Sequence, residues 1–178
     1  MTANSATMSS VRIRTMREED LDQVKEIDRM SFTIPWPDRS YEYEFYKNPL
    51  SLLLVAESEE QDSNHHIVGT LVVWLIIDEA HIATIVVHPE YRNQGIAKKM
   101  LAEALKIALQ KGMRQATLEV RANNFIAHKL YEQFGFEIVG RRDRYYRDNY
   151  EDALIMTIRD LDKEYLEWMG SILSDWTS

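Results

Sequence analysis

The sequence of 178 residues contains no cysteine. Disulfide bonds, thiolate metal sites and a covalent cysteine nucleophile are therefore excluded. Glycine and proline are also scarce, with six and four residues, which excludes collagen-like and low-complexity chains. Any chemistry must depend on other polar side chains, held in an ordinary folded domain.

Long apolar runs are missing as well. The longest, residues 67–77, includes Gly69 and Thr70 and is well short of the about 20 residues that a membrane-spanning helix requires. Residues 1–10 are small and polar, without the apolar centre of a secretory signal. We therefore expect a flexible tail over residues 1–10, a cytoplasmic protein and no membrane partner.

Positive charge is in deficit, because the formal net charge is −8. Tight non-specific binding to nucleic acid depends on clustered Lys and Arg that neutralise phosphates. Nucleic acid is therefore not an expected partner. The acidic balance is compatible with a basic substrate and equally with simple solubility.

A hydrophobic share of 45% supports one core in a chain of this length, and no linker divides it. Alternating and near-helical apolar spacings predict a mixed α/β (α+β) domain. Strands are expected at residues 11–15, 52–56, 67–77, 80–87, 116–120, 136–139 and 153–158, and helices at 17–30, 41–47, 95–111, 124–134 and within 161–178. The helix over 124–134 is expected to turn four apolar side chains inward: Ile126, Ala127, Leu130 and Phe134.

A glycine-containing turn joins the strand over 80–87 to the helix over 95–111. Its residues are Arg92, Asn93, Gln94, Gly95, Ile96 and Ala97. Unpaired N–H groups at a helix N-terminus carry partial positive charge and bind phosphate groups. The turn is neither a P-loop nor a dinucleotide fingerprint, although Glu119 lies about 20 residues further on. An ordinary strand-to-helix turn is the alternative.

Three polar residues follow the next strand. Glu119 lies near its carboxyl end, where ligands gather in open α/β sheets. Asn124 opens a helix, and Tyr131 lies seven residues later, close to two helical turns, so both project from one face. The alternatives are a solvated carboxylate for Glu119 and a core tyrosine for Tyr131.

Together these segments resemble the GNAT acetyltransferase superfamily. The resemblance rests on IVVHPEYRNQGIA at residues 85–97, LEVRANN at 118–124 and LYEQFGF at 130–136. His88 stands where aspartate is common and Asn123 where serine is common, but neither position is catalytic. Within the superfamily the chain is most similar to the RimI-type ribosomal-protein alanine N-acetyltransferases and to related archaeal and eukaryotic N-terminal acetyltransferase subunits.

The resemblance covers about residues 11–160 and implies the GNAT fold. That fold is a mixed, mostly antiparallel twisted sheet of about seven strands flanked by about four helices. Residues 11–160 would form the N-acetyltransferase domain, and residues 161–178 a C-terminal helical extension. The resemblance to the N-terminal acetyltransferase branch rests on LEVR followed by Asn124, on the Pro35-Trp36 loop and on residues 145–153.

The resemblance also implies acetyl-CoA as cosubstrate. Its contacts would be Ile85, Val86, Val87, Arg92, Asn93, Gln94, Gly95, Ile96, Ala97, Asn124 and Tyr131. Glu119 would remove a proton from the acceptor amine, and Tyr131 would protonate the departing thiolate. Because the chain has no cysteine and no Gly-x-Ser-x-Gly elbow, direct transfer in a ternary complex is favoured over an acyl-enzyme.

The implied acceptor is a protein N-terminal amine, with the N-terminal alanine of a ribosomal protein as one candidate. Glu119 and the aromatic segments at Pro35, Trp36, Tyr145 and Tyr146 would hold the peptide. Core packing of the two tyrosines is the alternative. A small-molecule amine such as a polyamine or aminoglycoside, and a non-catalytic acyl-CoA sensor, stay open as other functions.

Histidine is the remaining metal-ligand type. The candidates His65, His66, His81 and His88 lack the spacing of known zinc motifs. We expect no metal.

Overall fold

The computed structural model describes residues 10–59 and 66–175. The expected tail over residues 1–10 and the loop between the second and third strands fall largely outside these ranges. The described chain contains one seven-stranded sheet of order β1-β2-β3-β4-β5-β7-β6. Its strands are β1 (Val11–Thr15), β2 (Ser51–Ser58), β3 (Ile67–Ile76), β4 (Glu79–Val87), β5 (Gln115–Arg121), β6 (Glu137–Tyr146) and β7 (Glu151–Ile158).

All neighbouring strands are antiparallel except β4 and β5, so the expected mixed, mostly antiparallel sheet is confirmed. Five α-helices accompany it in the described residues: α1 (Leu21–Ser31), α2 (Asp38–Tyr46), α3 (Ile96–Gln110), α4 (Phe125–Gln133) and α5 (Lys163–Asp175). None of these described helices is long and apolar enough to cross a membrane.

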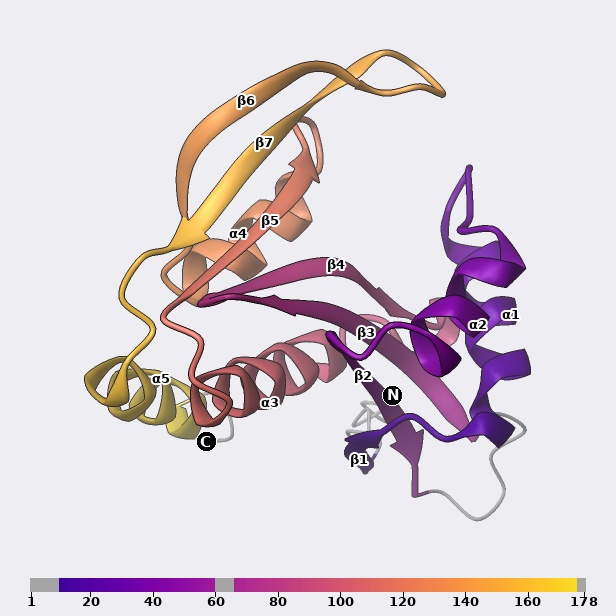
Figure 1. Cartoon of the computed structure of the whole chain (residues 1–178), viewed down its shortest axis with the longest axis horizontal. Helices are drawn as coiled ribbons and strands as arrows, with labels where there is room; N and C mark the ends of the chain where they lie inside the picture. The colour runs from indigo at the N-terminus through magenta and orange to yellow at the C-terminus, as the bar shows by residue number, and fades with distance from the viewer. Residues whose placement is uncertain (1–9, 60–65, 176–178) are drawn as a thin grey trace, which may run out of the picture.

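The helices divide between the two faces of the sheet (Figure 1). One core joins α1 and α2 to side chains such as Leu53, Val55 and Val72. A larger core joins α3, α4 and α5 to alternate residues of the same strands, including Leu52 and Leu54. This division follows from the strand period of two, which sends successive side chains to opposite faces.

The parallel pairing of β4 with β5 is short. It links Glu79–Ile82 to Gln115–Leu118, and beyond it Figure 1 shows the two strands diverging. A bulge at Ala83 interrupts the pairing of β4 with β3. One extra residue exchanges the faces of the following side chains, so Ile82 packs in the α3 core and Val86 in the α1 core.

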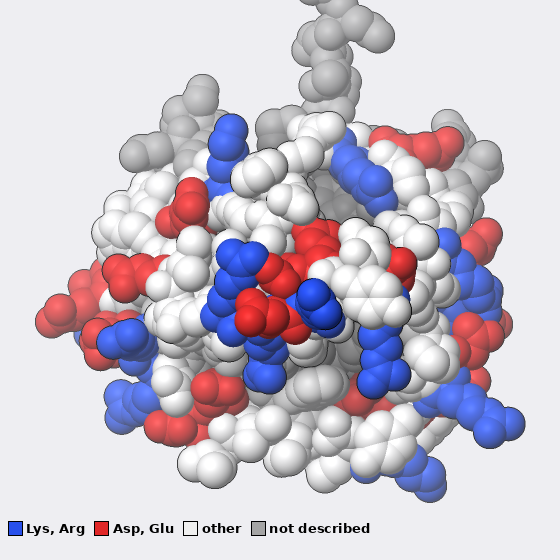
Figure 2. All heavy atoms as spheres, turned by 90° about the horizontal axis from the view of Figure 1, so that it is seen from above, with Lys and Arg blue, Asp and Glu red and all other residues white. Residues whose placement is uncertain are grey.

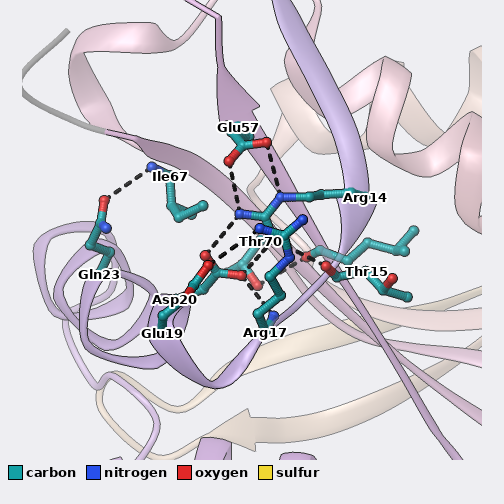
Figure 3. A network of polar contacts seen from close by, with 10 residues as sticks. Arg14, Thr15, Arg17, Glu19, Asp20, Gln23, Glu57, Ile67 and Thr70 are labelled. Atoms are coloured by element: carbon teal, nitrogen blue, oxygen red, sulfur yellow. Dashed lines mark hydrogen bonds and ion pairs between the residues drawn. The ribbon is translucent and has the colours of Figure 1, made fainter.

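The first strand is anchored by a polar network (Figure 3). Arg14 of β1 donates hydrogen bonds to both oxygens of Asp20, at 2.7 and 2.9 Å, and to both oxygens of Glu57 in β2, at 3.0 Å. Such two-pronged pairing of a buried guanidinium fixes geometry as well as charge. It holds the start of α1 against the sheet edge.

Two expectations need correction. The prediction that Ile126 faces inward is wrong, because its side chain is 83% exposed. His128 and Tyr131 are the buried residues of α4, and Ile126 lies about 200° around the helix axis from His128. Likewise β6 extends to Tyr146, well beyond the expected end at residue 139, because pairing with β7 extends a strand whose charged, exposed side chains carry no apolar signal.

The C-terminal helix α5 packs against the ends of α3 and α4. Leu161 and Met169 are buried in the larger core, and Tyr165 Oη donates a 2.7 Å hydrogen bond to the carbonyl of Phe134. Residues 161–175 are thus part of the packed body.

Candidate active site

The candidate site centres on the gap between β4 and β5. The N–H of His88 donates to the carbonyl of Val68 in β3. Because the two edges of a strand alternate along an antiparallel ladder, Val86 also bonds toward β3, while the N–H groups of Ile85 and Val87 point into the gap. The gap lies at the carboxyl ends of two parallel strands, where ligands bind in α/β sheets.

The turn before α3 has the backbone conformation and the open space that an anion site requires. Asn93 and Gly95 both have positive φ, 62° and 76°, and no atom lies within 4 Å of the position that a Cβ on Gly95 would take. The first turn of a helix carries partial positive charge on its backbone N–H groups, and the space beside Gly95 leaves room there for an anion. Gln94 Oε1 is the sole buried side-chain polar atom without a hydrogen bond in residues 10–59 and 66–175.

A groove of about 1100 Å³ opens at this turn and continues along α3 toward α5. Lys98 and Lys99 line it beside Asn93, Gln94 and Gly95. These lysines place positive charge next to the anion site, which suits a ligand with several phosphates. The sequence motif did not identify Lys98 and Lys99 as candidate phosphate contacts. Their positions in the first turn of α3 could have indicated this role.

Two predicted cofactor residues have side chains committed elsewhere. Arg92 donates from Nε to the Val87 carbonyl at 3.2 Å and from Nη2 to Ser31 Oγ at 3.1 Å, so it ties the turn to β4 and α1. The side chain of Ile96 is buried in the core, which leaves only its backbone for a ligand.

At the start of α4, Asn124 acts as the N-cap. Its Oδ1 accepts the N–H of Ala127 at 3.1 Å, which leaves its amide NH₂ as a donor. This cap fixes the direction in which α4, and with it Tyr131, leaves β5.

Glu119 is a mostly buried carboxylate with two basic neighbours. Its Oε2 lies 3.1 Å from His81 Nε2, and its Oε1 lies 3.2 Å from Arg142 Nη2. The hydrogen bond from His81 lowers the pKa of the Glu119 carboxyl below its usual value, against the opposing effect of burial. Glu119 is therefore ionised at neutral pH.

His81 lies in a row of stacked rings, which the sequence did not reveal. It stands opposite Trp74 of β3 in the sheet register. The two rings are stacked, with their centroids 5.4 Å apart and their planes inclined by 13°. Trp74 is also stacked with Trp36, with ring centroids 6.4 Å apart and ring planes inclined by 23°. The row connects the Pro35-Trp36 loop, predicted to bind substrate, with Glu119.

Tyr131 is buried, and burial raises the pKa of its phenol above the usual range, with a further contribution from Tyr146. Burial also raises the pKa of Tyr146, to about 12. Tyr146 interacts electrostatically with Glu119 as well. Both phenols are therefore protonated at neutral pH.

The turn between β6 and β7 is fixed by Arg121. Its guanidinium lies 3.9 Å from the Tyr146 ring centroid and pairs with Asp148 at 2.7 Å and Glu151 at 3.2 Å. Glu151 also accepts the N–H of Asn123 at 2.8 Å. Figure 2 views the molecule from the side of the β6–β7 hairpin and shows acidic and basic side chains intermingled at its centre.

The other predicted substrate contacts lie at the rim of this arrangement. Tyr145 is 47% exposed and meets Tyr146 edge to face at 5.2 Å, whereas Pro35 is partly buried beside Trp36. These positions leave aromatic surface available near Glu119, so core packing does not account for Tyr145.

His81 and His88 take part in contacts within the described chain, His81 with Glu119 and His88 at a turn. In the described ranges no three His, Asp or Glu side chains gather in a way that could hold a metal ion. His88 accepts the N–H of Glu90 and caps the short 3₁₀ turn Pro89–Tyr91, as an aspartate would there. His65 lies outside the described residues.

Comparisons with known proteins find similar sequences and folds. The model of the acetyltransferase (GNAT) family matches residues 21–136. A Bacillus subtilis (strain 168) protein, provisionally named ribosomal protein bS18-alanine N-acetyltransferase, is 40% identical over 146 residues, which cover 82% of this chain and 93% of that protein. The crystal structure of the ribosomal-protein-S18-alanine N-acetyltransferase from Escherichia coli is also similar, with a TM-score of 0.74 and 26% identity over 84% of this chain and 93% of that one.

A third similar protein is Arabidopsis thaliana NAA60, solved in complex with acetyl-CoA. It has a TM-score of 0.77 and 20% identity, and the match covers 84% of this chain and 98% of that one. At this identity the likeness concerns the fold.

Proposed function

The chain belongs to the acetyltransferase (GNAT) family, and we propose that it transfers the acetyl group of acetyl-CoA to the N-terminal amine of a protein. The observation that carries this proposal is the placement of Glu119. Its ionised carboxylate lies beside His81, next to the β4–β5 gap and at the end of an aromatic row.

For the cosubstrate, the pyrophosphate would lie on the turn at Asn93–Gly95. The left-handed backbone, the open space at Gly95 and the nearby Lys98 and Lys99 support this assignment. The pantetheine arm would follow the unpaired edge of β4. The N–H of Val87 points into the gap, and it would donate to the thioester oxygen as negative charge develops there.

For the transfer itself, a protein α-amine with a pKa of about 8 is largely protonated at neutral pH. Glu119, held by His81, would accept the ammonium proton directly or through water. The nitrogen lone pair then attacks the thioester carbon, the C–S bond breaks, and Tyr131 gives its phenolic proton to the thiolate. Burial raises the pKa of Tyr131, so its phenol carries this proton at neutral pH. The nitrogen, which still carries one proton more than an amide, gives that proton to the phenolate of Tyr131, and Glu119 releases the first proton to water.

The names of the relatives give an alanine of ribosomal protein S18 as the acceptor, and we propose that this chain acetylates the N-terminal alanine of a ribosomal protein, in the cytoplasm. The competing small amine would need only a cation site, whereas the row from Trp36 to His81 offers an extended surface for peptide backbone. A non-catalytic sensor would require neither Glu119 nor Tyr131.

The acceptor class is tested by steady-state kinetics with acetyl-CoA. We expect a short peptide beginning with Ala to have at least about tenfold higher kcat/KM than spermidine or an aminoglycoside. Peptides beginning with Ser, Met or Glu define the preference. A higher kcat/KM for the small amine would replace the peptide assignment.

Gly95→Glu should weaken coenzyme A binding by about tenfold or more in calorimetry. The substitution puts a negative charge in the space assigned to phosphate and strains a left-handed residue. Gly112→Glu is the matched control, because Gly112 also has positive φ, 89°, and open space, but follows the other end of α3. Equal affinities in the two folded variants would remove the cofactor assignment.

Glu119→Gln should lower kcat most at low pH. The lowered pKa keeps wild-type Glu119 ionised across the range from pH 6 to 9, whereas the variant depends on acceptor that is already deprotonated. That fraction falls about tenfold per pH unit below the amine pKa of about 8. The ratio of wild-type to variant kcat should therefore rise as pH falls. Glu137→Gln, at an exposed position that begins β6, should give a flat ratio, and a flat ratio for Glu119→Gln would exclude a general base.

Tyr131→Phe should reduce kcat by about 10²–10⁴-fold while acetyl-CoA affinity is retained, since only the proton donor is lost. The control is Tyr165→Phe, which removes another buried hydroxyl and its hydrogen bond to Phe134. It should cost about 1 kcal/mol of stability and leave kcat intact. Wild-type kcat in Tyr131→Phe would make Tyr131 a core residue only.

A further inference from the structure

A second cavity lies on the α1 and α2 face, separate from the cofactor turn. It has a volume of about 310 Å³ and is lined by Trp36, Pro37, Ser40, Glu44 and Trp74. Two of its walls are indole rings, both partly exposed, and Glu44 is the one acidic residue among these described lining residues.

Glu44 is buried, with 7% of its surface exposed, and its Oε2 accepts three hydrogen bonds. The donors are Asn48 Nδ2 at 2.7 Å, Trp74 Nε1 at 3.1 Å and Ser51 Oγ. An oxygen that accepts three donors suits an ionised carboxylate. Because these donors within the described residues are all neutral, none of them cancels the negative charge.

Trp36, which forms one wall of the cavity, is held in place by Asp28 and Tyr41. Asp28 is buried, accepts the backbone N–H of Trp36 at 2.7 Å and accepts the hydroxyl of Tyr41 at 2.7 Å. The Trp36 ring also meets Tyr41 at 5.2 Å. A buried anchor of this kind makes the cavity a preformed feature rather than a chance gap in a loop.

A cavity lined by a buried carboxylate and two partly exposed indoles suits a basic side chain. The carboxylate attracts the charged end of Lys or Arg, and the indoles offer apolar surface to its aliphatic stem. Resting on the proposed peptide acceptor, we infer that this cavity is a subsite for a basic side chain near the N-terminus of the acceptor. The acceptor class would thus be proteins that begin with a small residue followed closely by Lys or Arg.

The distance to Glu119 fits the second or third acceptor residue. Ser51, Trp74 and His81 lie opposite one another on β2, β3 and β4, and Glu119 lies on β5, the next strand. Strands are about 4.8 Å apart, so the span from Ser51, whose hydroxyl bonds to Glu44, to the strand β5 that carries Glu119 is about 14 Å. An extended peptide advances about 3.3 Å per residue, and a long basic side chain covers the rest.

The test uses Ala-initiated peptides with arginine, or its uncharged isostere citrulline, at position two or three. For the wild type we expect the arginine peptide to have about tenfold higher kcat/KM at one of the two positions. In Glu44→Gln this ratio should fall below about threefold. Glu42→Gln is the matched control, because Glu42 lies on the same helix but pairs with Lys25 at 2.7 Å and does not line the cavity; it should keep the wild-type ratio.

Trp36→Leu provides an independent variant, because it removes an indole wall without touching the hydrogen bonds of Glu44. The ratio of kcat/KM for the arginine peptide to that for the citrulline peptide should also fall in this variant. If Glu44→Gln does not fold, Trp36→Leu tests the subsite alone. Equal kcat/KM for arginine and citrulline in the wild type would overturn the subsite and leave peptide acetylation intact. If no peptide were acetylated while spermidine was, the proposed function itself would be rejected.

Discussion

The short parallel contact between β4 and β5 is the constraint on which the site depends. Four residue pairs join the strands, after which they diverge and leave two edges unpaired. Unpaired backbone inside a sheet is costly unless a ligand or side chain satisfies it. Arg92 satisfies the carbonyl of Val87 on one edge. The N–H groups that point into the gap are available for a ligand, so the interruption of the sheet would serve as the proposed binding site.

Charge placement makes this gap suitable for acyl transfer. Glu119 is kept ionised by His81 and Arg142, whereas burial keeps Tyr131 and Tyr146 neutral. Groups with opposite roles in proton transfer need environments that move their pKa values apart. Here the separation arises because Glu119 has basic neighbours and Tyr131 is packed in the core.

The two faces of the sheet would bind different substrates. The turn that precedes α3 faces the lysines of the larger helix layer, while the opposite face carries the row from Trp36 through Trp74 to His81. Cosubstrate and acceptor would thus approach the gap from different sides, which allows both to be bound before the amine attacks. Arg121 closes the arrangement by fixing the β6–β7 turn and Tyr146.

The sequence by itself determined the elements with strong local signals. The apolar stripe of α3, the turn at Gly95 and the strands from β1 to β5 follow from periodicity and turn chemistry, and the motifs around Glu119 and Tyr131 indicated the family. Only the tertiary structure decided that His81 and Arg142 meet Glu119 and that Glu44 lines one cavity with two indoles. It also decided that Ile126 faces outward and that β6 reaches Tyr146. These features depend on strand register and on which faces pack together, and contacts between residues far apart in the chain leave no periodic trace in any one segment.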